Sequence, residues 1–291
     1  MEEYGLSNFT CRDLMIASHL KCFNQDNFYI YLFLTAVLIN WRKDIPLVQD
    51  EVLRLMGYKL NTVQFENIED LESWTNYQNI SGTVLVELSN KAVKSLTCEN
   101  NKYKQDNFTI SIEAYDYRNM LFRVKYLRTD TCVNSKDLYV SRWINKECLK
   151  DYLRMQTNAK NGTNAFMYLS CLNNPEKTLT KEFLISYIKT MINPDNNMLF
   201  DLVNRYAKDR CFFKRQIYTL RRCYYGSMFA FDNYVADNLI TQNILLKEKW
   251  KKCLKEIIRE RDKLINIIYM DALRNRVSTR KYGELLKKKT K

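Results

Sequence analysis

The sequence predicts an α+β fold in which two small α+β domains precede a basic helical extension. Apolar residues alternate with polar ones in segments between 83 and 126, and they follow helical spacing on either side of that region. Basic residues gather in the C-terminal part of the chain. We therefore expect domains at 1–118 and 119–208 and the extension at 209–291.

The first elements are predicted to be helices. The segment 10–13, TCRD, has the capping-box pattern and predicts a helix near 11–20. Residues 26–40 are apolar on nearly all sides, which is typical of a buried helix. Residues 48–56 show helical spacing, and Gly57 follows where a helix cap needs a positive φ.

Three strands are expected next. Residues 83–88 form the short apolar run TVLVEL, and apolar residues alternate over 108–114. Over 122–126 the apolar residues alternate with Arg123 and Lys125, so this strand should have one buried face and one basic face.

The remaining pattern is mostly helical. After a turn at 128–131, apolar spacing predicts a helix from about Ile144. Two more helices are expected at 180–193 and 195–208, and the last long one runs from about 235 to 275.

The composition excludes several classes of site. The chain has 6 Gly and 3 Pro and lacks the GxxxxGK[ST], GxGxxG and GxSxG motifs, which argues against phosphate-binding glycine loops and hydrolases. A single histidine, His19, is too few for a Cys2His2 finger, and a His-dependent triad is close to excluded. No two of the 9 Cys form a CxxC motif. The longest apolar run, 28–39, is too short to span a bilayer. We expect an intracellular, non-enzymatic protein without catalytic residues, metal, cofactor or membrane contact.

Charge divides the chain. Residues 1–120 contain 11 Lys/Arg and 16 Asp/Glu, a net charge of −5, whereas residues 121–291 contain 35 and 17, a net +18. Such a basic excess indicates a polyanionic partner, most often nucleic acid or an anionic membrane surface. A solubilising charge balance without a partner is the alternative.

Four basic residues spaced four apart predict a binding helix. They are Arg142, Lys146, Lys150 and Arg154. On one helix they form a single row, and because like charges one turn apart repel, the row gains most when a polyanion lies against it. Arg123 and Lys125 are expected to contact the flanking phosphate backbone. A solvated basic face explains the row equally well.

Further basic residues lie closer to the C-terminus. A second predicted DNA-binding cluster includes Lys214, Arg215, Arg221 and Arg222. Aromatic residues interleave with it, either to stack on bases or to pack on a core. The tail 247–291, with 16 basic and 6 acidic residues, is expected to bind polyanions without sequence selectivity or to serve in nuclear targeting. An apolar seam in its helix allows a weak coiled coil, and hence a homodimer.

An acidic cluster offers one enzymatic alternative. Its members are Glu66, Glu69, Asp70 and Glu72. Carboxylates in such a group can hold Mg²⁺, as in nucleases, but they are more often a solvated helix surface.

Residues 121–206 resemble the KilA-N domain of large DNA viruses and phages. The resemblance rests on the segment 133–138, VNSKDL, on Trp143, on the segment 150–153, KDYL, and on the two helices predicted at 180–193 and 195–208. Trp143 stands only nine positions after Asn134, a shorter spacing than is usual, so the first helix of the unit must be short.

Residues 10–90 also resemble the N-terminal domain of BRO-type viral proteins, through the segment 41–58, WRKDIPLVQDEVLRLMGY. Together the two resemblances imply a viral DNA-binding protein in the host nucleus or a cytoplasmic viral factory. Some relatives add a RING and act as ubiquitin ligases, which the missing CxxC pairs argue against. We expect a non-enzymatic protein that contacts duplex DNA through a basic helix. The alternative is an interaction protein that recruits partners through its N-terminal domain and C-terminal helix.

Overall fold

The computed structural model of the chain describes residues 9–39, 45–77, 83–97, 107–127, 139–157, 164–172, 226, 229–230, 232, 234, 238 and 243–274. These residues have a mixed α+β structure. The turn predicted at 128–131 and the helices predicted at 180–193 and 195–208 lie outside them.

The described strands form one antiparallel sheet of six strands, in the order β1-β6-β2-β3-β4-β5. The strands are β1 (Tyr58–Phe65), β2 (Val84–Ser89), β3 (Asn107–Asp116), β4 (Leu121–Leu127), β5 (Tyr139–Asn145) and β6 (Asn164–Cys171). β3 and β4 form a hairpin, whereas β1 and β6 pair from Tyr58↔Cys171 to Phe65↔Asn164 across a long stretch of sequence. The predicted boundary between residues 118 and 119 lies in this hairpin, so strands on both sides of it belong to one sheet.

Seven helices have described bounds. They are α1 (Cys11–Phe23), α2 (Asn27–Ile39), α3 (Ile45–Leu55), α4 (Ile68–Tyr77), α5 (Asn90–Thr97), α6 (Lys146–Thr157) and α10 (Ile244–Leu273). Within the part of the chain that the structure describes, none of them combines the length and the apolar character needed to cross a bilayer.

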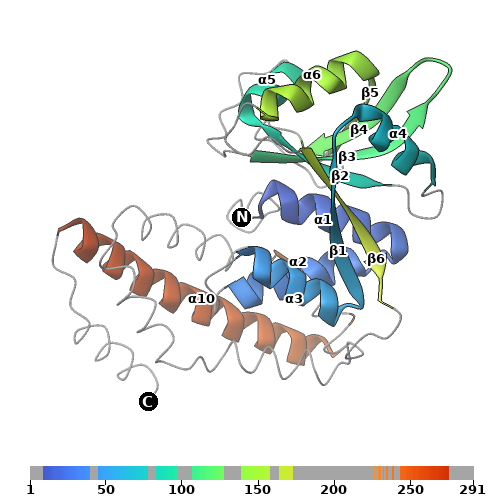
Figure 1. Cartoon of the computed structure of the whole chain (residues 1–291). Helices are drawn as coiled ribbons and strands as arrows, with labels where there is room; N and C mark the ends of the chain where they lie inside the picture. The colour runs from blue at the N-terminus through green and yellow to red at the C-terminus, as the bar shows by residue number, and fades with distance from the viewer. Residues whose placement is uncertain are drawn as a thin grey trace. The chain divides into compact units, whose positions relative to one another are not determined.

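The two faces of the sheet carry different helices (Figure 1). α4, α5 and α6 lie on the face formed by alternate residues such as Val86, Val124 and Phe166, which are almost fully buried. The ring of Trp74 in α4 lies 5.1 Å from that of Phe166. α1 contacts β3 and β4 on the opposite face. There the Sγ of Cys11 accepts a hydrogen bond from the backbone N–H of Thr109.

Several local predictions are confirmed. Thr10 and Asp13 form the capping box at the start of α1, with reciprocal side-chain and backbone hydrogen bonds. Gly57 has φ 83°, the left-handed conformation that glycine adopts without strain, in the turn that follows α3. The strands expected at 83–88, 108–114 and 122–126 correspond to β2, β3 and β4. The last predicted helix corresponds to α10, which begins nine residues later than expected.

The helix predicted from Ile144 is wrong at its start. Residues 139–145 form the strand β5, and α6 begins only at Lys146. The change of structure occurs at Asn145, whose side-chain oxygen accepts a hydrogen bond from the backbone N–H of Glu147 at 2.8 Å, as a helix N-cap does. β5 pairs with β4 along its whole length, from Leu121↔Asn145 to Leu127↔Tyr139.

Contacts between Cα atoms divide the chain into two units. The first comprises Thr10–Phe28 and Leu53–Glu176 and contains the whole sheet. The second comprises Met1–Phe9, Tyr29–Val52 and Lys177–Lys291. In the second unit, the ring of Tyr29 in α2 stacks on Tyr234 at 5.6 Å.

Candidate nucleic-acid interface

The structure divides the predicted basic row between a strand and a helix. Arg142 lies on β5, and only Lys146, Lys150 and Arg154 belong to α6. The guanidinium of Arg142 is exposed and lies 5.8 Å from the centre of the Tyr126 ring on the neighbouring strand. The expectation that all four residues share one helical stripe is therefore wrong. Arg142 belongs to a strand, in which side chains alternate between the two faces of the sheet and do not follow helical spacing.

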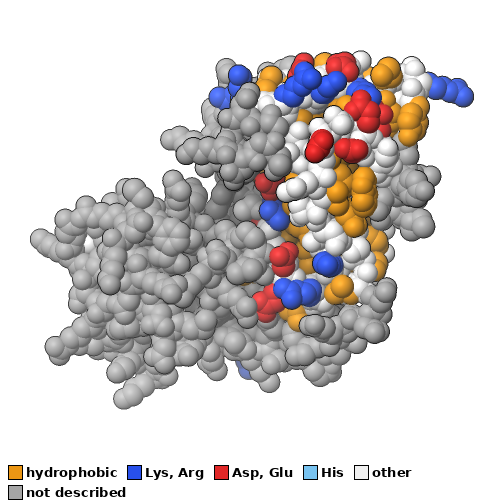
Figure 2. All heavy atoms as spheres, viewed as in Figure 1, with side chains coloured by type: hydrophobic (Ala, Val, Ile, Leu, Met, Phe, Trp, Pro, Cys, Tyr) orange, Lys and Arg blue, Asp and Glu red, His pale blue; other side chains and the backbone are white. Residues whose placement is uncertain are grey.

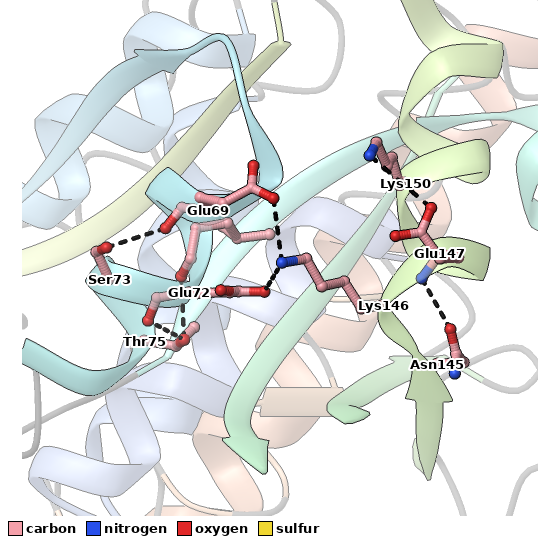
Figure 3. Close-up of polar contacts among 9 residues, drawn as sticks. Glu69, Glu72, Ser73, Thr75, Asn145, Lys146, Glu147 and Lys150 are labelled. Carbon is pink, nitrogen blue, oxygen red and sulfur yellow. Dashed lines mark hydrogen bonds and ion pairs between the residues drawn. The ribbon is translucent and has the colours of Figure 1, made fainter. Parts of the chain in front are cut away.

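Lys146 is already matched by carboxylates (Figure 3). Its ammonium lies 2.5 Å from an oxygen of Glu72 and 3.1 Å from an oxygen of Glu69, both on α4. The residue is only 8% exposed, so its charge is not available to a phosphate. The hydrogen bond to Glu72, above all, raises the pKa of Lys146. This residue joins α6 to α4, which is a structural role that the basic row did not predict.

Lys150 and Arg154 remain on the surface of α6. Their partners are one turn away on the same helix, Glu147 at 3.8 Å and Asp151 at 3.7 Å. Ion pairs at such distances on an exposed surface contribute little free energy, so an approaching phosphate can replace them at small cost. Figure 2 shows Lys/Arg and Asp/Glu side chains next to one another over the region where Figure 1 draws α5 and α6.

Arg123 and Lys125 share a carboxylate. Glu113, at an irregularity in the β3–β4 register, lies 3.3 Å from Arg123 and 3.5 Å from Lys125. The ammonium of Lys125 also donates to the hydroxyl of Ser18 in α1 at 2.8 Å and lies over the ring of Tyr139. Lys125 therefore holds α1 to the sheet, whereas half of the Arg123 side chain is exposed.

The second predicted cluster, with Lys214, Arg215, Arg221 and Arg222, lies outside the described residues.

The acidic cluster of the sequence analysis lies within the described residues. Glu69 and Glu72 contact Lys146, and Asp70 accepts hydrogen bonds from the backbone N–H groups of Glu66 and Asn67. Among the described residues, no group of three or more metal-ligating side chains is close enough to hold an ion.

α10 presents a longer basic surface. Asn243 caps this helix, because its side-chain oxygen accepts from the backbone N–H of Leu246. Five exposed basic residues follow at intervals of three or four, and together they form the α10 basic face. They are Lys249, Lys252, Lys255, Arg259 and Lys263. At 1.5 Å per residue, this face is about 21 Å long.

The first part of the α10 basic face is the least compensated. Lys249, Lys252 and Lys255 form no ion pair with any residue that the structure describes. Lys251, on another side of the helix, is mostly buried and lies 3.5 Å from Asp232. The exposed carboxylates of this helix include Glu248 and Glu256, so the face is predominantly rather than wholly basic. Polyanion binding was predicted for the whole segment 247–291. The spacing of its basic residues by three or four positions is the signal that shows which of them share one exposed face of the helix.

Searches of protein-family models, curated proteins and solved structures found no match to this chain.

Proposed function

We propose that this protein is a non-enzymatic nucleic-acid-binding protein that holds phosphate groups on the α10 basic face. The observation that carries the proposal is the row of exposed Lys249, Lys252 and Lys255, continued by Arg259 and Lys263. Amino groups along about 21 Å of helix meet several phosphates of a duplex, which has one negative charge per 1.7 Å or so of its axis. Duplex DNA is therefore the favoured ligand.

The described surface supports binding without sequence selectivity. The α10 basic face contains only Lys and Arg as donors, and Lys contacts a phosphate as a point charge without reading bases. On α6, the exposed Arg154 and the half-buried Lys150 add two more cations. The net +18 of residues 121–291 supports the same interpretation. The proposal includes two further points. The C-terminal part of the chain is a basic helical extension, and the protein is of viral origin and of the KilA-N and BRO type.

The salt dependence of binding tests the proposal. If about six phosphates are neutralised, log K should fall against log salt concentration with a slope of about −5 for duplex DNA, because condensed counterions are released. We would measure this by fluorescence anisotropy with duplex DNA, single-stranded DNA and RNA in parallel. A salt-independent affinity for all three ligands contradicts phosphate binding.

The start of α10 favours a second candidate function, the recruitment of a protein partner. Ile244, Leu245 and Leu246 are exposed, and Leu245 is 83% exposed. Apolar residues grouped in this way mark interaction surfaces more often than isolated ones do. A homodimer through this helix belongs to this second function. Unchanged nucleic-acid affinity after loss of the α10 basic face would favour it over the first.

A further inference from the structure

One part of the sheet face that contacts α1 is open to solvent. α1 reaches this face through Lys125, which donates to Ser18, and through Tyr139, whose hydroxyl donates to the backbone oxygen of Leu14 at 2.7 Å. Further along the same two strands, Arg123 and Trp143 are direct cross-strand partners. Trp143 stands four residues beyond Tyr139, or about 13 Å along β5.

Arg123 and Trp143 form an exposed pair, which we call the Arg–Trp pair. Trp143 is 52% exposed, and the side chain of Arg123 is 50% exposed. Directly opposed residues on antiparallel strands have Cβ atoms about 5 Å apart, so the two side chains leave the sheet from neighbouring positions on one face. Figure 2 shows hydrophobic side chains at the surface where Figure 1 draws the β3–β4 hairpin and the end of β5.

The chemistry of the Arg–Trp pair suits a nucleobase and its phosphate. An indole ring on a sheet offers a flat surface on which a base can stack, and every base has such a face. Arg123 contacts Glu113 through Nε, which is one of five N–H donors on its guanidinium. While Nε contacts Glu113, the terminal amino groups of Arg123 can hold a phosphate.

The charges around the pair favour a polyanion over an apolar protein surface. Arg118 in the hairpin turn is exposed, and Lys125 stands on the same face of the sheet as the indole. Of the nearby acids, Glu113 is engaged by Arg123 and Lys125. The carboxylate of Asp116 accepts from the side chain of Asn119 and from backbone N–H groups in the turn. The surroundings of the indole are therefore cationic.

From these contacts we infer that the Arg–Trp pair is a stacking site for an unpaired base of single-stranded nucleic acid. Bases in a duplex are stacked on one another and do not offer a free face to a side chain, so this contact belongs to single strands. The inference rests on the proposed function, since both require the protein to bind nucleic acid. The site adds affinity for single strands alone.

An abasic ligand separates stacking from charge. We would compare an oligothymidylate of about 16 nucleotides with an abasic strand and a duplex of the same length, at one salt concentration. Trp143→Ala should weaken oligothymidylate binding about tenfold and leave the other two affinities unchanged, because one base–aromatic stack is lost. Trp143→Phe should retain most of the affinity. The matched control is Ser141→Ala, an exposed position on the same strand and face.

Other results contradict the inference in distinct ways. If Trp143→Ala lowers the affinity for all three ligands equally, Trp143 supports the fold or a charge contact and does not stack on a base. Thermal unfolding of the Trp143→Phe variant would distinguish an effect on the fold from an effect on a charge contact. If Trp143→Ala binds oligothymidylate with unchanged affinity, the Arg–Trp pair is not a stacking site, and a protein partner becomes the better explanation of its exposure. If the wild-type protein binds none of the ligands, the proposed function fails first; loss restricted to oligothymidylate supports both.

Discussion

Replacing Lys249, Lys252 and Lys255 together by Glu is expected to abolish binding to nucleic acid. Each substitution removes a phosphate contact and puts a carboxylate in its place, so the three exposed positions change the local charge by six units. Because these lysines account for about half of the phosphates that the protein is expected to neutralise, affinity for duplex DNA should fall at least about 100-fold at moderate salt. Anisotropy titration of a labelled duplex measures this fall directly.

A matched variant separates local charge from net charge. Lys59, Lys91 and Lys94 are exposed residues of β1 and α5, in the unit that contains the sheet. Their replacement by Glu lowers the net charge of the chain by the same amount and should reduce duplex affinity far less. Thermal unfolding of both triple variants should resemble that of the wild type, because all six side chains are exposed. Equal loss of affinity in the two variants contradicts a specific role for α10.

Lys146→Met is expected to destabilise the fold with little effect on nucleic-acid affinity. The substitution keeps most of the side-chain volume but leaves Glu72, which is mostly buried, without the ammonium that lies 2.5 Å away. An uncompensated carboxylate in such a position costs about 2 kcal/mol, less than a fully buried pair because Glu69 is exposed. The expected fall in Tm is roughly 4–8 °C.

The same contact gives a dependence on pH. A backbone hydrogen bond within its own residue and then the contact with Lys146 lower the pKa of Glu69, whereas the hydrogen bond to Glu72 raises that of Lys146. The lowered carboxyl pKa contributes stability above the ordinary value of 4.5, and this is lost as pH falls through the folded value. The raised pKa of Lys146 contributes stability at neutral pH that is lost only at strongly alkaline pH.

Urea unfolding of the wild type and the Met variant between neutral and acidic pH measures this contribution. The difference in unfolding free energy between the two proteins should shrink as the pH falls below the ordinary carboxyl range. Lys146→Arg is the control, since it retains a cation at this position. A constant difference at every pH would show that Lys146 acts by packing alone.

Local sequence patterns predicted the helices, strands and turns that are determined by a few neighbouring residues. The capping box of Thr10 and Asp13 fixes the start of α1, and Gly57 ends the turn after α3 because its φ of 83° is strained for other residues. The alternation of Arg123 and Lys125 with apolar residues predicted β4 and its two faces. These signals act over a few residues, so tertiary contacts did not override them.

The failures concern contacts between residues distant in sequence. The spacing of Arg142 and Lys146 fits a helix, but Arg142 belongs to a strand that pairs with β4. Glu69 and Glu72 precede Lys146 by more than 70 residues, and nothing in local spacing indicates that α4 and α6 meet. The strand β1 was not predicted, because its partner β6 lies about 100 residues later.

The salt dependence of duplex binding, compared between the wild type and a variant with Lys249, Lys252 and Lys255 replaced by Ala, tests the central claim most directly. The slope of log K against log salt counts the phosphates that the protein neutralises. The account predicts a slope of about −5 for the wild type and about −2.5 for the variant, since three phosphates are no longer neutralised. Equal slopes for the two proteins would show that these lysines do not contact phosphates and would contradict the account.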